Sequence, residues 1–164
     1  MIERPDKDEY YLRLAEEVST RSTCLRRRFG AVIVKDDQII STGYVGAPRG
    51  TPNCIELGVC PREQAGIPAG QRYELCRSVH AEANAIIHAA RLEMLGGALY
   101  LACVNAKNGE LVPGTKPCKM CTRLIINAGL ALVLVREEPG RFTRYLVSDW
   151  VERDNGLVDP ESYY

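Results

Sequence analysis

The chain has 164 residues, with 21 basic and 21 acidic side chains, seven cysteines and two histidines. A chain of this length is expected to form one domain, residues 1–164, and to bury roughly two-thirds of its unfolded surface without a disulfide framework. Its balanced charge lacks the basic excess of proteins that wrap nucleic acid, so nucleic acid is not an expected partner. An odd cysteine count is more typical of metal binding or catalysis in an intracellular chain than of a secreted disulfide scaffold.

Membrane insertion and secretion are not expected either. The first nine residues are mostly charged and lack an apolar core, and the longest nearly apolar stretch, residues 124–135, contains Asn127 and Gly129. A membrane-spanning helix needs roughly 20 apolar residues, and a signal peptide needs an apolar core. The sequence therefore predicts a cytoplasmic protein with no membrane partner.

The first third of the chain predicts a helix, a hairpin and an irregular segment. Residues 8–20 carry apolar side chains at spacings of three and four, which indicates an amphipathic helix. Two β-rich runs, residues 30–34 and 39–44, predict an antiparallel hairpin. Prolines and glycines then break every period, which predicts an irregular cysteine-bearing insertion at about residues 46–77. Such a long segment is uncommon in a compact domain unless it is functional or cross-linked.

Helices and strands alternate in the rest of the chain. Ser78 is expected to cap a helix that runs to about Met94. Residues 98–103 predict a buried strand, residues 117–128 a helix, and residues 131–135 a second strand, and this order predicts a parallel crossover.

A last extended run is predicted at residues 145–148. It follows the preceding strand too closely for a parallel return, because parallel connections need about a dozen residues. It is therefore expected to be antiparallel, and the fold class is α/β.

Two short motifs lie at the predicted starts of helices: HAE at residues 80–82 and PCKMC at residues 117–121. Together they match the signature of zinc-dependent deaminases. Cysteines at positions i and i+3 share a helix face, and a helix N-terminus favours the thiolate that binds zinc. His80 offers a third ligand, which leaves the fourth tetrahedral position open, as catalytic zinc sites require. Glu82 is placed to act as general acid and base.

A non-catalytic zinc module is the alternative from a different class of protein. Cys-x-x-Cys alone is common in structural zinc sites. A structural site needs no general base, so the presence of Glu82 argues against this alternative.

The chain resembles the deoxycytidylate (dCMP) deaminases of the cytidine deaminase superfamily over nearly its whole length. The resemblance implies a three-layer α/β/α fold with a mixed five-stranded sheet, and a homo-oligomeric enzyme that converts dCMP and water into dUMP and ammonia. It also implies that Zn²⁺ binds His80, Cys118 and Cys121, while Glu82 moves protons. The stretches that carry the resemblance are RSTCLRR (21–27), GAP (46–48), ELCR (74–77), HAEANAI (80–86) and LIINAG (124–129), with the hairpin and the insertion.

Substrate recognition departs from the family pattern at Val45. The family usually has Gly-Tyr-Asn-Gly after the second strand, whereas residues 43–46 are GYVG, and valine cannot make the hydrogen bond of asparagine. Residues 105–116 replace a very short family turn and change one wall of the expected pocket. A deaminase of another nucleotide, a nucleoside, a free base or a base in RNA is therefore an alternative, although the balanced charge argues against RNA.

Several side chains near the expected site are candidates for binding a nucleotide substrate. Guanidinium groups bind phosphate bidentately, so arginines could hold a 5′-phosphate. These candidates are Arg21, Arg26, Arg27, Arg28 and Arg49, and the further candidate contacts are Tyr44, Val45 and Ala81. His88 is expected to be a packing or surface residue.

Four cysteines in or beside the insertion suggest a second metal site. A four-thiolate structural zinc bound by Cys24, Cys54, Cys60 and Cys76 would tie the insertion to the start of the domain. Two disulfides, free buried thiols and a redox switch are the alternatives, and the expected cytoplasmic location opposes disulfides. Cys103 is expected to be a small apolar core residue.

Overall fold

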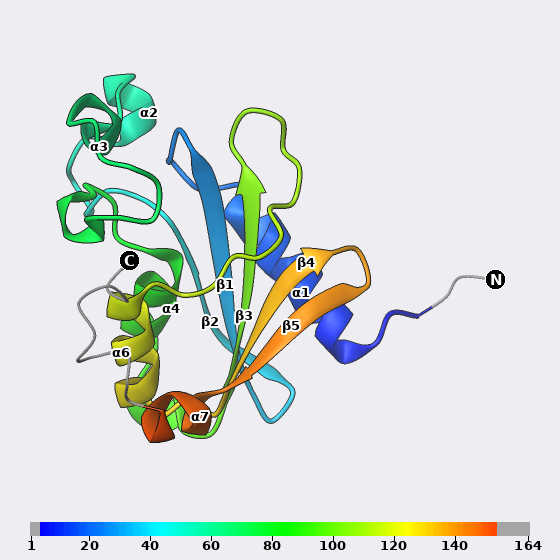
Figure 1. Cartoon of the computed structure of the whole chain (residues 1–164). Helices are drawn as coiled ribbons and strands as arrows, with labels where there is room; N and C mark the ends of the chain where they lie inside the picture. Colours follow the sequence, from blue (N-terminus) through cyan, green and yellow to red (C-terminus); the bar gives the residue numbers. More distant parts are fainter. Residues whose placement is uncertain (1–3, 154–164) are drawn as a thin grey trace.

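The computed structural model describes residues 4–153 and contains one mixed five-stranded sheet (Figure 1). The strands are β1 (Arg27–Lys35), β2 (Gln38–Tyr44), β3 (Ala98–Asn105), β4 (Leu132–Glu138) and β5 (Arg141–Leu146). Their order is β2-β1-β3-β4-β5. The β3–β4 pair is parallel and the other three pairs are antiparallel, which confirms the predicted mixed sheet.

Helices cover both faces of this sheet. The helices are α1 (Lys7–Ser19), α2 (Cys54–Leu57), α3 (Pro61–Gln64), α4 (Ala81–Ile87), α5 (Arg91–Met94), α6 (Lys119–Ala128) and α7 (Val147–Glu152), with a 3₁₀ turn at Tyr73–Leu75. Of these, α2 and α3 belong to the insertion and lie apart from the sheet (Figure 1). Figure 1 shows α1 on one side of the sheet and α4 and α6 together on the other. The three-layer α/β/α arrangement is therefore confirmed. None of the helices within residues 4–153 is long and apolar enough to cross a lipid bilayer.

Alternation along the central strands divides the core in two. Val32 and Val34 of β1 point towards α1 and pack in one cluster with Leu12 of that helix. Ala31 and Ile33 point the other way, into the core under α4 and α6. Side chains of a strand point alternately to its two faces, so a strand between two helical layers is apolar throughout.

The predicted hairpin is confirmed, and two aspartates make its turn. β1 and β2 pair antiparallel, with Lys35 opposite Gln38. The two linking residues, Asp36 and Asp37, have φ values of 49° and 61°. Two-residue hairpin loops favour positive φ, and aspartate tolerates this region better than most residues.

The predicted helix over residues 78–94 is wrong in two respects. It is split, because α4 ends at Ile87 and α5 begins at Arg91. His80 rather than Ser78 is the N-cap, because Val79 and Gly46 exchange two backbone hydrogen bonds that hold residues 78–80 extended. The alanines in the break favour helix by propensity, so tertiary contacts override the local preference here.

Two other predicted boundaries also shift. The last strand is antiparallel to β4 as predicted, but it covers Arg141–Leu146, and α7 begins at Val147. Val147 is buried in the core and its N–H donates to the carbonyl of Ala131, which turns the chain out of the sheet. The helix predicted at residues 117–128 begins at Lys119, with Cys118 as its N-cap.

Candidate active site

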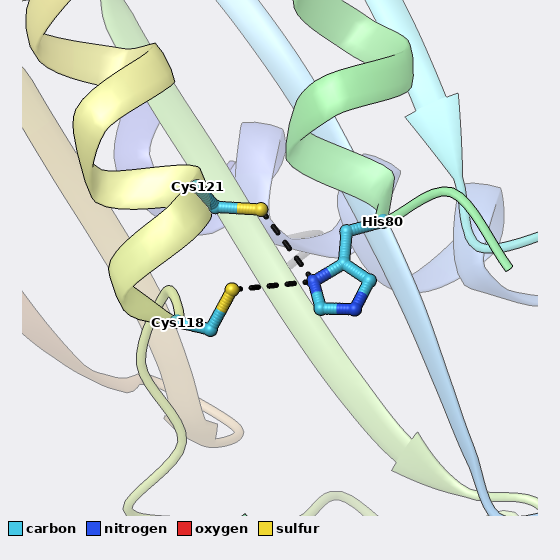
Figure 2. Close-up of side chains that lie close together, drawn as sticks. All are labelled: His80, Cys118 and Cys121. Carbon is cyan, nitrogen blue, oxygen red and sulfur yellow. Dashed lines mark hydrogen bonds between the residues drawn. The ribbon is translucent and has the colours of Figure 1, made fainter. Parts of the chain in front are cut away.

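Three side chains that could bind a metal ion meet where α4 and α6 begin. His80 is the N-cap of α4, Cys118 is the N-cap of α6, and Cys121 lies in the first turn of α6. The sulfurs of Cys118 and Cys121 lie 3.4 and 3.5 Å from Nδ1 of His80. Figure 2 shows the three side chains pointing towards one another from the two neighbouring helices.

This donor set fits a zinc ion. Two thiolates and one imidazole are ligands that zinc prefers, and three protein ligands leave one position open. A nitrogen and a sulfur bound to the same tetrahedral zinc lie about 3.5 Å apart, given typical bond lengths of about 2.0 and 2.3 Å. The observed separations of 3.4 and 3.5 Å agree with that distance. Among residues 4–153, this is the only group of three or more candidate ligands whose atoms all lie within 4.8 Å.

Hydrogen bonding shifts the pKa values of the two thiols in opposite directions. The bond with Cys121 lowers the pKa of the Cys118 thiol, against the opposing effect of burial, and the contact with His80 lowers it further. The same bond with Cys118 raises the pKa of Cys121. The hydrogen bond thus favours the thiolate at Cys118 and the thiol at Cys121. Zinc binds thiolates, so metal binding is expected to release the Cys121 proton.

Glu82 lies beside this group and is shielded from water. Its side chain is 3% exposed and it contacts Cys121 through a hydrogen bond. Burial raises the pKa of Glu82, and the positive charge of His80 only partly offsets that effect. A buried carboxyl group with a raised pKa can both accept and return a proton.

Close packing against β2 positions α4, and with it His80 and Glu82. A Cβ atom at Gly43 would lie 2.3 Å from both the carbonyl oxygen of Ala81 and the backbone nitrogen of Ala85. Ser41 Oγ donates to the Ala85 carbonyl at 2.7 Å, and Asn84 Nδ2 donates to the Tyr44 carbonyl at 2.8 Å. A glycine at position 43 is thus what allows the helix to lie directly on the strand.

Gly43→Ala is expected to push α4 off the sheet. The added methyl group meets backbone atoms, which cannot rotate away, so the free energy of unfolding should fall by about 1–3 kcal/mol. Zinc retention against a chelator should also fall, because His80 adjoins the displaced helix. Urea unfolding and metal analysis check this. Thr42→Ala, an exposed neighbour, is the control and should change stability by no more than about 0.5 kcal/mol.

A cavity of about 890 Å³ contains both His80 and Glu82. Its described lining has many basic side chains and only two acidic ones, Glu82 and Asp149. The basic side chains are Arg26, Arg27, Arg62, Lys116, Lys119, Arg123, Arg144 and Arg153. Lys116, Lys119 and Arg123 were not among the predicted substrate contacts, although the signal for them is their position beside and within the Pro-Cys-x-x-Cys helix.

The structure separates the predicted substrate contacts into two groups. Arg26, Arg27 and Val45 line the cavity, and Val45 is buried. The others are not part of the lining: Arg21, Arg28, Tyr44, Arg49 and the fully buried Ala81. Arg49 instead lies with a guanidinium nitrogen 2.7 Å from Nε2 of His88, outside the cavity.

The insertion supplies a wall of the site that sequence patterns did not predict. The ring of Tyr73 meets the His80 ring edge-on, with centroids 5.4 Å apart and planes at 89°. The Arg62 guanidinium lies 4.7 Å from the centre of the Tyr73 ring, which is a cation–π distance. Tyr73 follows a stretch without periodicity, so no local signal placed it next to the metal ligand.

The four cysteines in or beside the insertion lie near enough to act on the Cys54 thiol, but they are less tightly grouped than His80, Cys118 and Cys121. Burial raises the pKa of the Cys54 thiol, and the nearby Cys24, Cys60 and Cys76 raise it further. All seven cysteines lie in the described part of the chain, and none forms a disulfide. Cys103 is fully buried in β3, as predicted for a core residue.

The sheet, the His/Cys/Cys group and the buried glutamate at the helix starts define the class of zinc-dependent hydrolytic deaminases. Residues 5–137 match the family model described as the cytidine and deoxycytidylate deaminase zinc-binding region. The chain belongs to this family, and it is a zinc-dependent hydrolytic deaminase.

Curated relatives and a solved structure agree with the family match. The deoxycytidylate deaminase of Mycobacterium phage D29 is 37% identical over 142 residues, which cover 84% of this chain and 99% of that protein. The deoxycytidylate deaminase of Schizosaccharomyces pombe is 37% identical over 131 residues, 80% of this chain but only 37% of the longer yeast protein. The crystal structure of the dCMP deaminase of cyanophage S-TIM5 in complex with dCMP and dUMP is similar, with a TM-score of 0.59 and 27% sequence identity. The alignment covers 92% of this chain and 91% of that chain.

Proposed function

We propose that this chain deaminates cytosine nucleotides and that dCMP is its substrate, with dUMP and ammonia as products. The observation that carries the proposal is the buried Glu82 beside His80, Cys118 and Cys121, inside a cavity with a strongly basic lining. The D29 relative is a deoxycytidylate deaminase, and the S-TIM5 structure holds dCMP and dUMP, which supports the same substrate here.

In this mechanism His80, Cys118 and Cys121 hold the metal. Zinc supplies Lewis acidity there and lowers the pKa of water, so that a nucleophile forms at neutral pH. Glu82 accepts a proton from the water that adds to C4 of cytosine and passes a proton to ring nitrogen N3. Glu82 then takes the second proton, from the hydroxyl now on C4, and delivers it to the amino group, which leaves as ammonia as the C4 carbonyl forms. The burial of Glu82 keeps bulk water from taking over these transfers.

The charge of the cavity favours a nucleotide over a nucleoside or a free base. Basic side chains outnumber acidic ones in its lining, although the whole chain has equal numbers of both. Such a surface attracts an anionic ligand and strengthens contacts with phosphate. Val45 adds an apolar side chain to the cavity lining, so the polar contacts of the substrate must come from other residues.

A substrate panel tests the proposal. The zinc-loaded protein is incubated with dCMP, dCTP, CMP, deoxycytidine, cytosine and guanine, and ammonia release is followed. The expected result is the highest kcat/KM for dCMP. Two results would contradict the proposal: deamination of only a free base, cytosine or guanine, or no ammonia from any cytosine nucleotide.

The proposal includes a second, structural zinc bound by Cys24, Cys54, Cys60 and Cys76. Their proximity supports it, because four thiolates around one tetrahedral ion form a closed structural site. Such an ion would fix the insertion, which carries Tyr73 against His80.

Metal analysis is expected to find two zinc ions for each wild-type chain. Cys54→Ser should lower this number to one, because it removes a proposed ligand of the second ion and Cys54 is not part of the cavity lining. Cys103→Ser also removes a buried thiol and should leave both ions in place. A single zinc ion in the wild-type chain would contradict the second site.

Homo-oligomeric assembly and a cytoplasmic location stay predictions. Light scattering of the purified zinc-loaded protein tests the first of them.

A further inference from the structure

The loop that connects β3 to α6, residues 106–117, is held firmly over the carboxyl ends of two parallel strands. Its Val112 N–H donates to the Cys103 carbonyl of β3 at 2.9 Å. Its Gly114 N–H donates to the Glu137 carboxylate of β4, which also accepts a 2.7 Å hydrogen bond from Thr143 Oγ1. Ligands of α/β sheets bind in the crevice at this end of the strands.

Thr115 of this loop carries a buried hydroxyl with no partner. The residue is 6% exposed, and Oγ1 has no hydrogen bond to any described residue. Thr115 lines the cavity that contains Glu82. A buried unpaired hydroxyl costs free energy, so a native structure that retains one invites a functional explanation.

A second unpartnered donor lines the same cavity. Arg26 pairs through Nε with Glu63 at 3.1 Å, but its NH1 is buried without a partner. The backbone of Arg26 adjoins the start of the loop, because the Ala106 N–H donates to the Arg26 carbonyl at 3.0 Å. The ion pair with Glu63 fixes the guanidinium while leaving NH1 for a ligand.

These donors suit an anion. A hydroxyl and a guanidinium can both donate to phosphate oxygens, which only accept hydrogen bonds. Arg27, Lys116 and Arg123 also line the cavity, and none of the three pairs with an acidic side chain in residues 4–153. A neutral base or sugar would leave this positive charge uncompensated.

We infer that Thr115 is a specificity-determining residue, whose hydroxyl binds the 5′-phosphate of the nucleotide together with Arg26. The inference rests on the proposed deamination of a cytosine nucleotide. In it, the loop before Pro117 selects nucleotides over nucleosides. Thr115 is pre-positioned by the bond between Gly114 and Glu137, so little ordering of the loop is needed on binding.

Thr115→Val tests the inference, because valine keeps the shape of the side chain and removes the hydroxyl. The zinc-loaded wild type, Thr115→Val and Thr115→Ser are compared in kcat/KM for dCMP and deoxycytidine and in affinity for dUMP. Thr115→Val should lose roughly 10- to 100-fold on dCMP and on dUMP binding, with no change on deoxycytidine. Thr115→Ser should stay close to wild type. Thr42→Val, an exposed site outside the cavity, is the matched control and should change nothing.

Stability distinguishes binding from a structural role. Because the hydroxyl has no partner in the free protein, Thr115→Val should unfold at the same or a higher temperature than wild type. A lower unfolding temperature, or equal losses on dCMP and deoxycytidine, would overturn the inference. So would a Thr115→Val enzyme with the wild-type preference for dCMP. A wild-type enzyme that deaminates no cytosine nucleotide would instead overturn the proposed function and this inference with it.

Discussion

Glu82→Gln is expected to reduce kcat for dCMP by on the order of 10²–10⁴-fold while zinc content stays unchanged. Glutamine has nearly the same shape but cannot accept and return a proton. The site is too buried for bulk water to replace the carboxyl group, since Glu82 is only 3% exposed. Ammonia release and metal analysis on the same preparation measure both effects.

The control for this variant is Glu17→Gln, on the exposed face of α1 and on the opposite side of the sheet. It makes the same chemical change and should leave turnover and zinc content at wild-type values. Loss of zinc from Glu82→Gln would show that Glu82 is a metal ligand and contradict its role in proton transfer. Unchanged turnover would contradict it as well.

The metal-binding group could be predicted from the sequence because its motifs are local. The proposed ligands Cys118 and Cys121 lie three residues apart at a helix start, and Glu82 follows His80 by two residues. Only one long-range step, the contact of α4 with α6, was needed to join the two motifs. The family resemblance supplied that step, and the structure confirms the resulting juxtaposition.

The rest of the cavity depends on segments that carry no periodic signal. Tyr73 lies in the irregular insertion and Thr115 in a loop, and both reach the site through backbone bonds and packing that only the folded chain provides. The same reason explains the error at Ser78. Its residue type favours a helix cap, but the pairing of Val79 with Gly46 keeps the chain extended for two more residues.

A buried ion pair between α1 and β4 leads to the largest expected effect on stability. Arg136 NH1 lies 2.9 Å from Glu9 Oε2, with side-chain exposures of 4% and 9%, and Arg136 Nε lies 2.8 Å from Glu16. Glu9 also accepts hydrogen bonds from Arg13 and from the Gly140 N–H. Breaking a buried pair from one side costs more than the pair contributes, because the Glu9 carboxylate stays buried with only the exposed Arg13 and the Gly140 N–H to compensate its charge.

Arg136→Met is therefore expected to lower the free energy of unfolding at pH 7 by about 3 kcal/mol. Arg141→Met is the matched control, since its ion pair with Glu138 is exposed and should contribute less than about 1 kcal/mol. Urea unfolding at a fixed zinc concentration measures both. Equal losses in the two variants would contradict the importance of the buried pair.

The pH dependence of the stability loss in Arg136→Met provides a second, independent test of this prediction. Burial alone would raise the pKa of Glu9, but hydrogen bonds from Arg136 and Arg13 outweigh it and hold that pKa below its ordinary value of 4.5. The unfolded chain therefore binds the proton more readily, and the wild type loses the contribution of Glu9 as the pH falls below about 4.5. Without Arg136, protonation removes a poorly compensated charge, so the difference between variant and wild type should shrink between pH 7 and pH 4. A difference that grows on acidification would contradict the assignment of the loss to Glu9.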